Sequence, residues 1–159
     1  MKKIFLIGFT LALLAAVTGC QNNGHIGSLF GTSALTQYTV NAQRVDSVVV
    51  GEDTIPVENV FFSFQNNVVN IVAVLDEFNN RESRFGTWAR NGNVFELDFK
   101  HHDDYFEEGT DVYAAPAYLG MISTEPMIMT VVDDNSKAFT LSWEDPHGNI
   151  RTYRLRKTW

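Results

Sequence analysis

The clearest structural signal in this chain reads Asn91-Gly92-Asn93-Val94-Phe95-Glu96-Leu97-Asp98-Phe99-Lys100. After the first three residues, apolar and charged side chains alternate, which is the pattern of a strand with one buried face. Asn91-Gly92 favours a type I′ hairpin turn, because both central residues of that turn need a positive φ. We therefore predict that residues 84–90 pair with residues 94–101.

The same alternation recurs along the chain, and no helical periodicity longer than about two turns follows residue 24. Turn residues separate the segments, as in Asn66-Asn67 and Asp145-Pro146-His147-Gly148. This pattern predicts an all-β fold, an up-and-down antiparallel β-barrel of about eight to nine strands, with a β-sandwich as the alternative. The candidate strands are 35–40, 45–50, 60–65, 68–75, 84–90, 94–101, 127–132, 137–143 and 149–157.

Residues 102–126 interrupt this regular spacing with a mixture of acidic and aromatic side chains. A loop of that length inside a small domain is usually functional or contains an element of its own. We interpret the segment as a lid over the barrel mouth. Alternatively, residues 118–123 form one more short strand.

The N-terminus has the features of an export signal. Lys2 and Lys3 precede an apolar run at 4–17, which is too short for a membrane span of about 20 residues. Val17-Thr18-Gly19-Cys20 then resembles a bacterial lipobox, in which the cysteine becomes the lipidated first residue. An ordinary signal with a chance cysteine is the alternative. Cys20 is the only cysteine of the chain, so this reading leaves the folded domain without disulfides or a catalytic thiol.

These features predict three regions: a lipoprotein signal peptide at 1–19, a lipidated anchor and short tether at 20–28, and a β-barrel domain at 29–159. Gln21-Asn22-Asn23 lacks the second-position aspartate that marks inner-membrane retention in familiar lipoproteins, and it lacks an acidic surface-export run. By that resemblance the anchor lies in the outer membrane and the barrel faces the periplasm.

Length and charge limit the function classes. With 159 residues, the chain is one domain by the usual length prior. Twelve Lys and Arg stand against nineteen Asp and Glu, giving a net charge of −7, and loss of Lys2 and Lys3 with the signal makes it −9. A protein this acidic lacks the overall electrostatic footprint for nucleic acid or for anionic lipid headgroups.

Several blocks resemble the lipocalin-like lipoproteins of bacterial envelopes, which are grouped as a domain of unknown function. The blocks are HIGSLFGT at 25–32, FFSFQNNVV at 61–69, Gly86-Thr87-Trp88, the 95–101 strand and the basic end YRLRK at 153–157. The resemblance covers nearly the whole mature chain and implies a lipocalin-like barrel, but it implies no site chemistry.

One departure concerns the closed end of the barrel. Lipocalin-type barrels begin with Gly-x-Trp, whose indole plugs that end under an arginine of the last strand, whereas Gly31-Thr32 is followed here by Ser33. The resemblance implies that Arg154 or Arg156 covers this end. Trp88 and Trp159 are the tryptophans that we expect to replace the missing indole.

Catalysis and metal binding are disfavoured. His101-His102-Asp103-Asp104, followed by Glu107 and Glu108, is the most metal-like cluster, but adjacent residues of a strand point to opposite faces. We interpret it as a solvated acidic loop. The chain has neither a Gly-x-Ser-x-Gly elbow nor a His-Glu-x-x-His helix motif. We therefore expect no enzyme activity, no metal and no cofactor.

The remaining clue is a set of apolar side chains that the strand pattern places inside the barrel. An eight-stranded barrel is either filled or just wide enough for one small ligand. The favoured interpretation is a membrane-anchored barrel that binds a small apolar or amphipathic ligand, and the alternative is a filled-core interaction subunit of an envelope assembly. In the second case the outward Phe61 would mark a partner surface. The predicted ligand-lining residues are Phe62, Phe64, Phe95, Leu97, Phe99 and Trp143.

Overall fold

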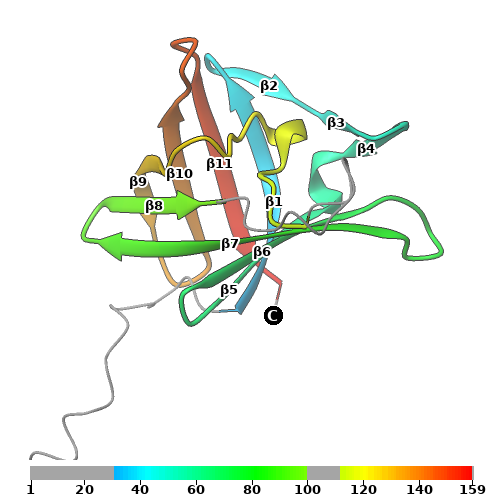
Figure 1. Cartoon of the computed structure of the whole chain (residues 1–159), viewed down its shortest axis with the longest axis horizontal. Helices are drawn as coiled ribbons and strands as arrows, with labels where there is room; N and C mark the ends of the chain where they lie inside the picture. The colour runs from blue at the N-terminus through cyan, green and yellow to red at the C-terminus, as the bar shows by residue number, and fades with distance from the viewer. Residues whose placement is uncertain (1–30, 100–111, 159) are drawn as a thin grey trace, which may run out of the picture.

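The computed structural model describes residues 31–99 and 112–158, and its strands form one closed sheet with a small hairpin beside it (Figure 1). The closed sheet contains β1 (Gly31–Val40), β2 (Gln43–Val45), β5 (Val60–Gln65), β6 (Val68–Val74), β7 (Arg81–Asn91), β8 (Val94–Asp98), β9 (Met127–Asp134), β10 (Ala138–Glu144) and β11 (Ile150–Lys157). The hairpin contains β3 (Ser47–Val50) and β4 (Asp53–Pro56), and two short 3₁₀ helices are η2 (Val57–Asn59) and η3 (Ala117–Leu119).

The predicted antiparallel barrel is confirmed. Strand order is β11-β10-β9-β8-β7-β6-β5-β1, and β1 also pairs with β11, which closes eight strands into a barrel. β1 pairs with β5 only over Gly31–Ala34, and its second half pairs with the extra strand β2 instead. β1 therefore leaves β5 near its middle, and the β3–β4 hairpin occupies the chain between β2 and β5.

The strand boundaries differ from the prediction in two regions. β7 begins at Arg81 rather than at 84, and β1 begins at Gly31 rather than at 35. The predicted 45–50 strand is divided between β2 and β3, and β4 was not predicted. In the turn after β1, Asn41 and Ala42 both have positive φ (51° and 64°), as a type I′ turn requires, and this turn folds β2 back onto β1, whereas β3 pairs with β4.

The hairpin between β7 and β8 is confirmed, but its turn is displaced by one residue. Asn91 pairs with Val94, so the two turn residues are Gly92 and Asn93. Of these, only Gly92 has a positive φ, 60°, which is the pattern of a type II′ turn with glycine at its first position rather than type I′. Gly92 is thus the glycine that the first position of this turn needs, and Asn91 belongs to the strand.

An aromatic cluster fills the barrel near the first residues of β1. The Phe64 ring lies 5.5 Å from the Trp88 ring, 5.7 Å from the Phe95 ring and 5.9 Å from the Phe139 ring, between ring centroids. Edge-to-face and offset ring contacts of this kind stabilise a core beyond simple burial. Because Gly31 pairs with Phe64, this cluster marks the end of the barrel at which β1 begins.

The described part of the long loop covers the opposite end. Residues 117–119 form η3, so the alternative of a strand at 118–123 is wrong. Leu119 and Met121 are buried, and η3 contacts β3 of the hairpin. Residues 112–126 therefore cover the barrel end at which β1 finishes, as the lid interpretation expects for this part of the segment.

Candidate functional site

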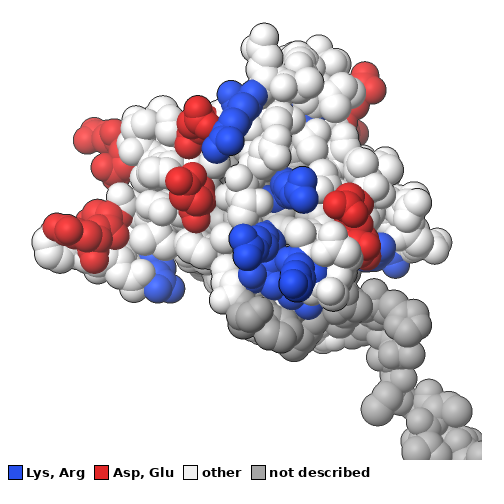
Figure 2. All heavy atoms as spheres, turned by 180° about the vertical axis from the view of Figure 1, so that it is seen from behind, with Lys and Arg blue, Asp and Glu red and all other residues white. Residues whose placement is uncertain are grey.

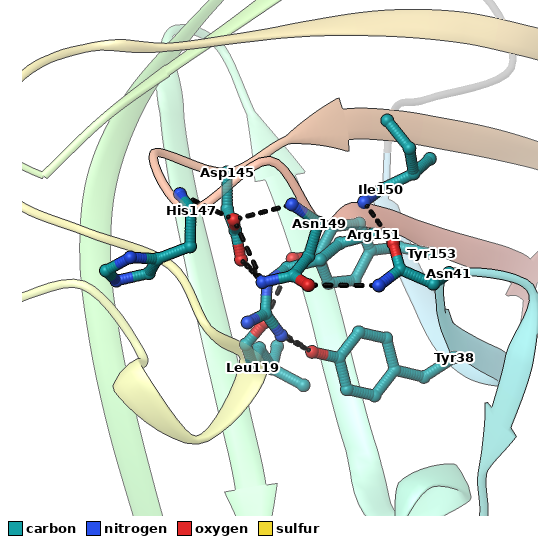
Figure 3. A network of polar contacts seen from close by, with 9 residues as sticks. All are labelled: Tyr38, Asn41, Leu119, Asp145, His147, Asn149, Ile150, Arg151 and Tyr153. Carbon is teal, nitrogen blue, oxygen red and sulfur yellow. Dashed lines mark hydrogen bonds and ion pairs between the residues drawn. The ribbon is translucent and has the colours of Figure 1, made fainter.

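The covered barrel end is organised around one backbone carbonyl (Figure 3). The rings of Tyr38 on β1 and Tyr153 on β11 stack with centroids 5.2 Å apart and an interplanar angle of 11°. Both hydroxyls donate to the carbonyl oxygen of Leu119, at 2.8 and 2.9 Å. Two buried tyrosines from the barrel wall thus hold the covering segment in place.

A second layer of polar contacts begins at the β10–β11 turn. The Asp145 carboxylate accepts hydrogen bonds from the backbone N–H groups of His147 and Asn149, both at 2.9 Å. It also accepts from Nε of Arg151 at 2.8 Å, and the Arg151 guanidinium donates to the Tyr38 hydroxyl. The turn, the last strand, the first strand and the lid therefore form one connected network (Figure 3).

This environment shifts the protonation equilibria of the network. Burial alone would raise the pKa of Asp145, but the hydrogen bonds from Asn149, Arg151 and His147 outweigh it and hold that pKa well below its usual range. Burial raises the pKa of Tyr38 and, more strongly, that of Tyr153, although the Arg151 charge opposes both shifts. At neutral pH the network therefore holds two neutral phenols and one ion pair.

Gly120 fits against the Arg151 side chain. Its φ is +73°, and a Cβ at this position would overlap Cζ and Nη1 of Arg151. Glycine suits the left-handed backbone, and a larger residue here would have to displace the Arg151 guanidinium group. Gly120, the residue that follows η3, therefore packs directly against the guanidinium group of Arg151.

A cleft opens beside this network, between the β3–β4 hairpin, the start of β7 and the lid. Its volume is about 420 Å³, and we call it the mouth cleft. Most of its walls are apolar or small side chains and backbone. The lining residues are Val49, Val50, Gly51, Glu82, Arg84, Ala114, Ala115, Ala117 and Tyr118.

The polar groups of the mouth cleft come from β7. Glu82 pairs across the sheet with Ala73, and Arg84 pairs with Ile71; because both partners are fully buried, these two charged residues share the inward face of the sheet. Nη2 of Arg84 lies 2.9 Å from Oε1 of Glu82, and their side chains are 17% and 25% exposed. The cleft thus contains a partly buried ion pair.

Tyr118 adds a hydroxyl to the same region. This oxygen is buried and has no hydrogen-bond partner within the described part of the chain. Burial raises the pKa of Tyr118, the negative charge of Glu82 raises it further, and Arg84 lowers it. The mouth cleft therefore combines apolar walls, an ion pair and a neutral phenol, which is a typical composition for a small-molecule site.

The six predicted ligand-lining residues are buried in the packed core, between 0% and 7% exposed. Phe62 and Phe64 lie on β5, Phe95 lies on β8 and Phe99 follows β8, and the Phe64 ring contacts four other aromatic rings. None of these six residues lines the mouth cleft. The structure separates the aromatic core at one end from the polar cleft at the other.

The structure assigns the barrel-end arginine differently from the resemblance. Arg151, Tyr153 and Leu155 share the inward face of β11, so Arg154 and Arg156 lie on its exposed outer face. Arg151 is the inward arginine, and it lies at the lid-covered end rather than at the end where β1 begins; there it donates to the Tyr38 hydroxyl.

Trp88 occupies the opposite end, where it stacks on Phe95 with ring centroids 5.4 Å apart. It therefore lies in the region expected for the missing indole. Ser33 on β1 is 1% exposed, and its hydroxyl has no hydrogen-bond partner among residues 31–99 and 112–158. Trp159 lies outside the described residues.

Other predicted features also fall outside the described residues, namely Cys20, the signal region and the cluster from His101 to Glu108. Within 31–99 and 112–158 no three His, Cys, Asp or Glu side chains gather as a metal site would require. Nor does any helix in those ranges have the length and apolar character of a membrane span.

An apolar groove lies on the outside of the barrel wall. Its volume is about 520 Å³, and its lining residues are Val68, Phe85, Gly86, Thr87, Asp98, Val112 and Tyr113. A second outer groove of about 430 Å³ includes Phe61, which confirms that Phe61 points outward while Phe62 is buried. The outer face of β5, β6 and β7 therefore contributes several apolar side chains to these two grooves.

Comparison with known proteins identifies the fold. Neither a protein-family model nor a curated protein matches the chain. A lipocalin-like protein from Bacteroides uniformis has a similar structure, with a TM-score of 0.55 and 18% sequence identity over 82% of this chain and 99% of that one. An uncharacterized protein from Bacteroides eggerthii matches with a TM-score of 0.52 and 15% identity, over 80% of this chain and 98% of that one. These similarities show a lipocalin-like barrel.

Proposed function

We propose that this protein is a lipid-anchored, lipocalin-like barrel of the cell envelope that binds a small amphipathic molecule in the mouth cleft. The observation that carries the proposal is the Glu82–Arg84 ion pair in a cleft whose other walls are apolar. A cleft of about 420 Å³ falls within the range of small-ligand sites. The apolar part of the ligand would lie on Val49, Val50 and the alanines, and its polar end would meet the ion pair.

This proposal moves the ligand from the barrel interior to its mouth. The inner aromatic residues then form a rigid base, and the tyrosine network fixes the lid that makes one wall of the cleft. A site with apolar walls, one ion pair and a phenol is suited to selective retention of a ligand. We propose binding rather than catalysis as the function.

The test is native mass spectrometry of the full chain purified from its own host in lipid nanodiscs. We expect a small molecule that is released on denaturation, and fluorescence enhancement of a dansyl-labelled fatty acid by the protein. Ala117→Phe places a ring in the cleft from an exposed lining position and should reduce both signals at least about fivefold, as loss of ~1 kcal/mol or more implies. Val132→Phe, at a 65% exposed position outside the cleft, is the control.

The second candidate function is an interaction subunit with a filled core. The packed aromatic interior and the outer apolar groove favour it. An empty native spectrum together with no response from the fatty-acid probe would reject ligand binding and support this alternative. Crosslinking in intact cells would then identify the partner.

The anchor is a separate part of the proposal and rests on the lipobox-like sequence before Cys20. We expect the mature N-terminal peptide to begin at Cys20 and to carry the mass of a diacylglyceryl group. Cys20→Ser should release the protein from the membrane fraction. An unmodified Cys20 in the mature protein would contradict the anchor without affecting the cleft.

A further inference from the structure

Four cationic residues lie close together in this acidic protein, where β10 begins and β11 ends. Arg154 and Arg156 are exposed on β11, because Tyr153 and Leu155 take the inward positions of the strand. Lys137 precedes β10, and its carbonyl accepts a hydrogen bond from the backbone N–H of Lys157 at 3.0 Å. We call Lys137, Arg154, Arg156 and Lys157 the basic wall. Figure 2 shows a Lys and Arg cluster at the lower centre of this face.

Small uncharged residues flank the two arginines on the neighbouring strands. Arg156 pairs with Ala34 on β1 and with Ala138 on β10. Arg154 likewise pairs with an uncharged residue on each side, Gln37 and Thr140. Cross-strand partners share a face, so the guanidinium groups stand among side chains that neither neutralise nor cover them.

Arg154, Arg156 and Lys137 differ from other cations of the barrel in their ion pairing. Elsewhere on the barrel, Arg44 meets Asp46 at 2.6 Å and Arg90 meets Asp134 at 2.7 Å. Within the described ranges, no acidic side chain forms an ion pair with Arg154, Arg156 or Lys137. The nearest acidic residue by strand register is Asp133, which lies across Thr140 from Arg154. Local positive charge therefore persists despite the net charge of −7.

The basic wall lies beside the point at which the chain enters the barrel. Ser33 pairs with Lys157 and Ala34 with Arg156, only a few residues after Gly31. Ten residues separate Cys20 from Gly31, and at ~3.5 Å per residue they span at most about 35 Å. An acyl group on Cys20 would therefore hold this wall within reach of the bilayer surface.

We propose that the basic wall docks the barrel onto the anionic phospholipid headgroups of the membrane that carries its anchor. The proposal rests on the lipid anchor of the proposed function. One acyl signal and a cluster of cations act together, since each Lys or Arg near an anionic surface adds to the attraction. Docking through this wall leaves the mouth cleft, at the far end of β1, away from the site of attachment.

The experiment is lysine acetylation of the full chain, quantified for each peptide by mass spectrometry. The protein is placed with vesicles of phosphatidylcholine alone or with about one-third phosphatidylglycerol. Thr54→Lys supplies a reference lysine at an exposed position of the β3–β4 hairpin. We expect anionic vesicles to slow acetylation of Lys137 at least about threefold relative to the lysine introduced at position 54, and salt at about 0.5 M to restore it.

Two double variants with equal change in charge make the result specific. Arg154→Gln with Arg156→Gln should abolish the protection of Lys137. Arg44→Gln with Arg81→Gln, at exposed positions outside the basic wall, should leave it intact. Equal protection by neutral vesicles, or protection that survives the first double variant, would overturn the proposal.

The outcome is independent of the two parts of the proposed function. If Cys20 is unmodified but anionic vesicles still protect Lys137, the anchor fails and the basic wall stands. If Cys20 is acylated and Lys137 is unprotected, the basic wall fails and the anchor stands. Ligand release in the native spectrum is measured separately from both.

Discussion

Gly120→Ala tests whether the contact between the lid and Arg151 stabilises the fold. An L-residue at a φ of +73° costs about 1–2 kcal/mol. The new methyl carbon would overlap Cζ of Arg151, so the guanidinium must move away from Asp145 and Tyr38. Loss of these charge-assisted hydrogen bonds costs about 1.5–3 kcal/mol. We therefore expect a total loss of about 2.5–5 kcal/mol in the free energy of unfolding.

The assay is urea unfolding of the full chain, followed by tryptophan fluorescence and circular dichroism. Gly148→Ala is the matched control, because Gly148 has a φ of +79° but a methyl group there would meet nothing within 4 Å. It should lose only the backbone contribution of about 1–2 kcal/mol. In an Arg151→Met background, Gly120→Ala should cost no more than Gly148→Ala does. Equal losses for the two glycine variants in the native background would refute the proposed role of the Arg151 contact.

Three further outcomes follow from the same structure. Ala42→Gly should raise the free energy of unfolding by about 1 kcal/mol, measured by urea titration, because Ala42 holds a φ of 64° in the β1–β2 turn. Burial raises the pKa of Tyr38, Tyr118 and Tyr153. Their contribution to stability is therefore complete below pH ~10 and is lost as the pH rises further. Ultraviolet titration should show these phenolates forming only as the barrel unfolds. The pKa of Asp145 is held low, so its contribution is present above pH ~4 and falls at lower pH; thermal melts of Asp145→Asn should show a smaller loss of stability on acidification than those of the native chain.

Alternation along the strands was sufficient to predict the barrel, because a buried face constrains every second residue. Phe62, Phe95 and Leu97 are buried as that pattern predicted. The same counting applied further would have located Glu82 and Arg84, which precede Trp88 at even spacing. Glu82 was missed because the predicted strand began at 84, and Arg84 was missed because it then stood at the strand end; β7 in fact begins at Arg81.

The arginine expected at the closed barrel end shows that a residue's role cannot be assigned from a family resemblance alone. Tyr153 and Leu155 are inward residues of β11, so alternation places Arg154 and Arg156 on the outer face, and the inward Arg151 lies at the other, lid-covered end of the barrel. The network around Leu119 depends on a different kind of information. Tyr38 lies 81 residues and Tyr153 lies 34 residues from Leu119 in the sequence, and only the closed sheet brings the three residues together.

Pairing of the first strand with the last also sets the order in which the chain can fold. Ser33 meets Lys157, so the barrel closes only after nearly the whole described chain has been made. Long loops must be closed before such contacts stabilise anything, which slows folding. Until β11 arrives, β1 and β10 both present open edges that can pair with other chains. During synthesis, the most aggregation-prone state of this protein is therefore an open sheet that lacks only its final strand.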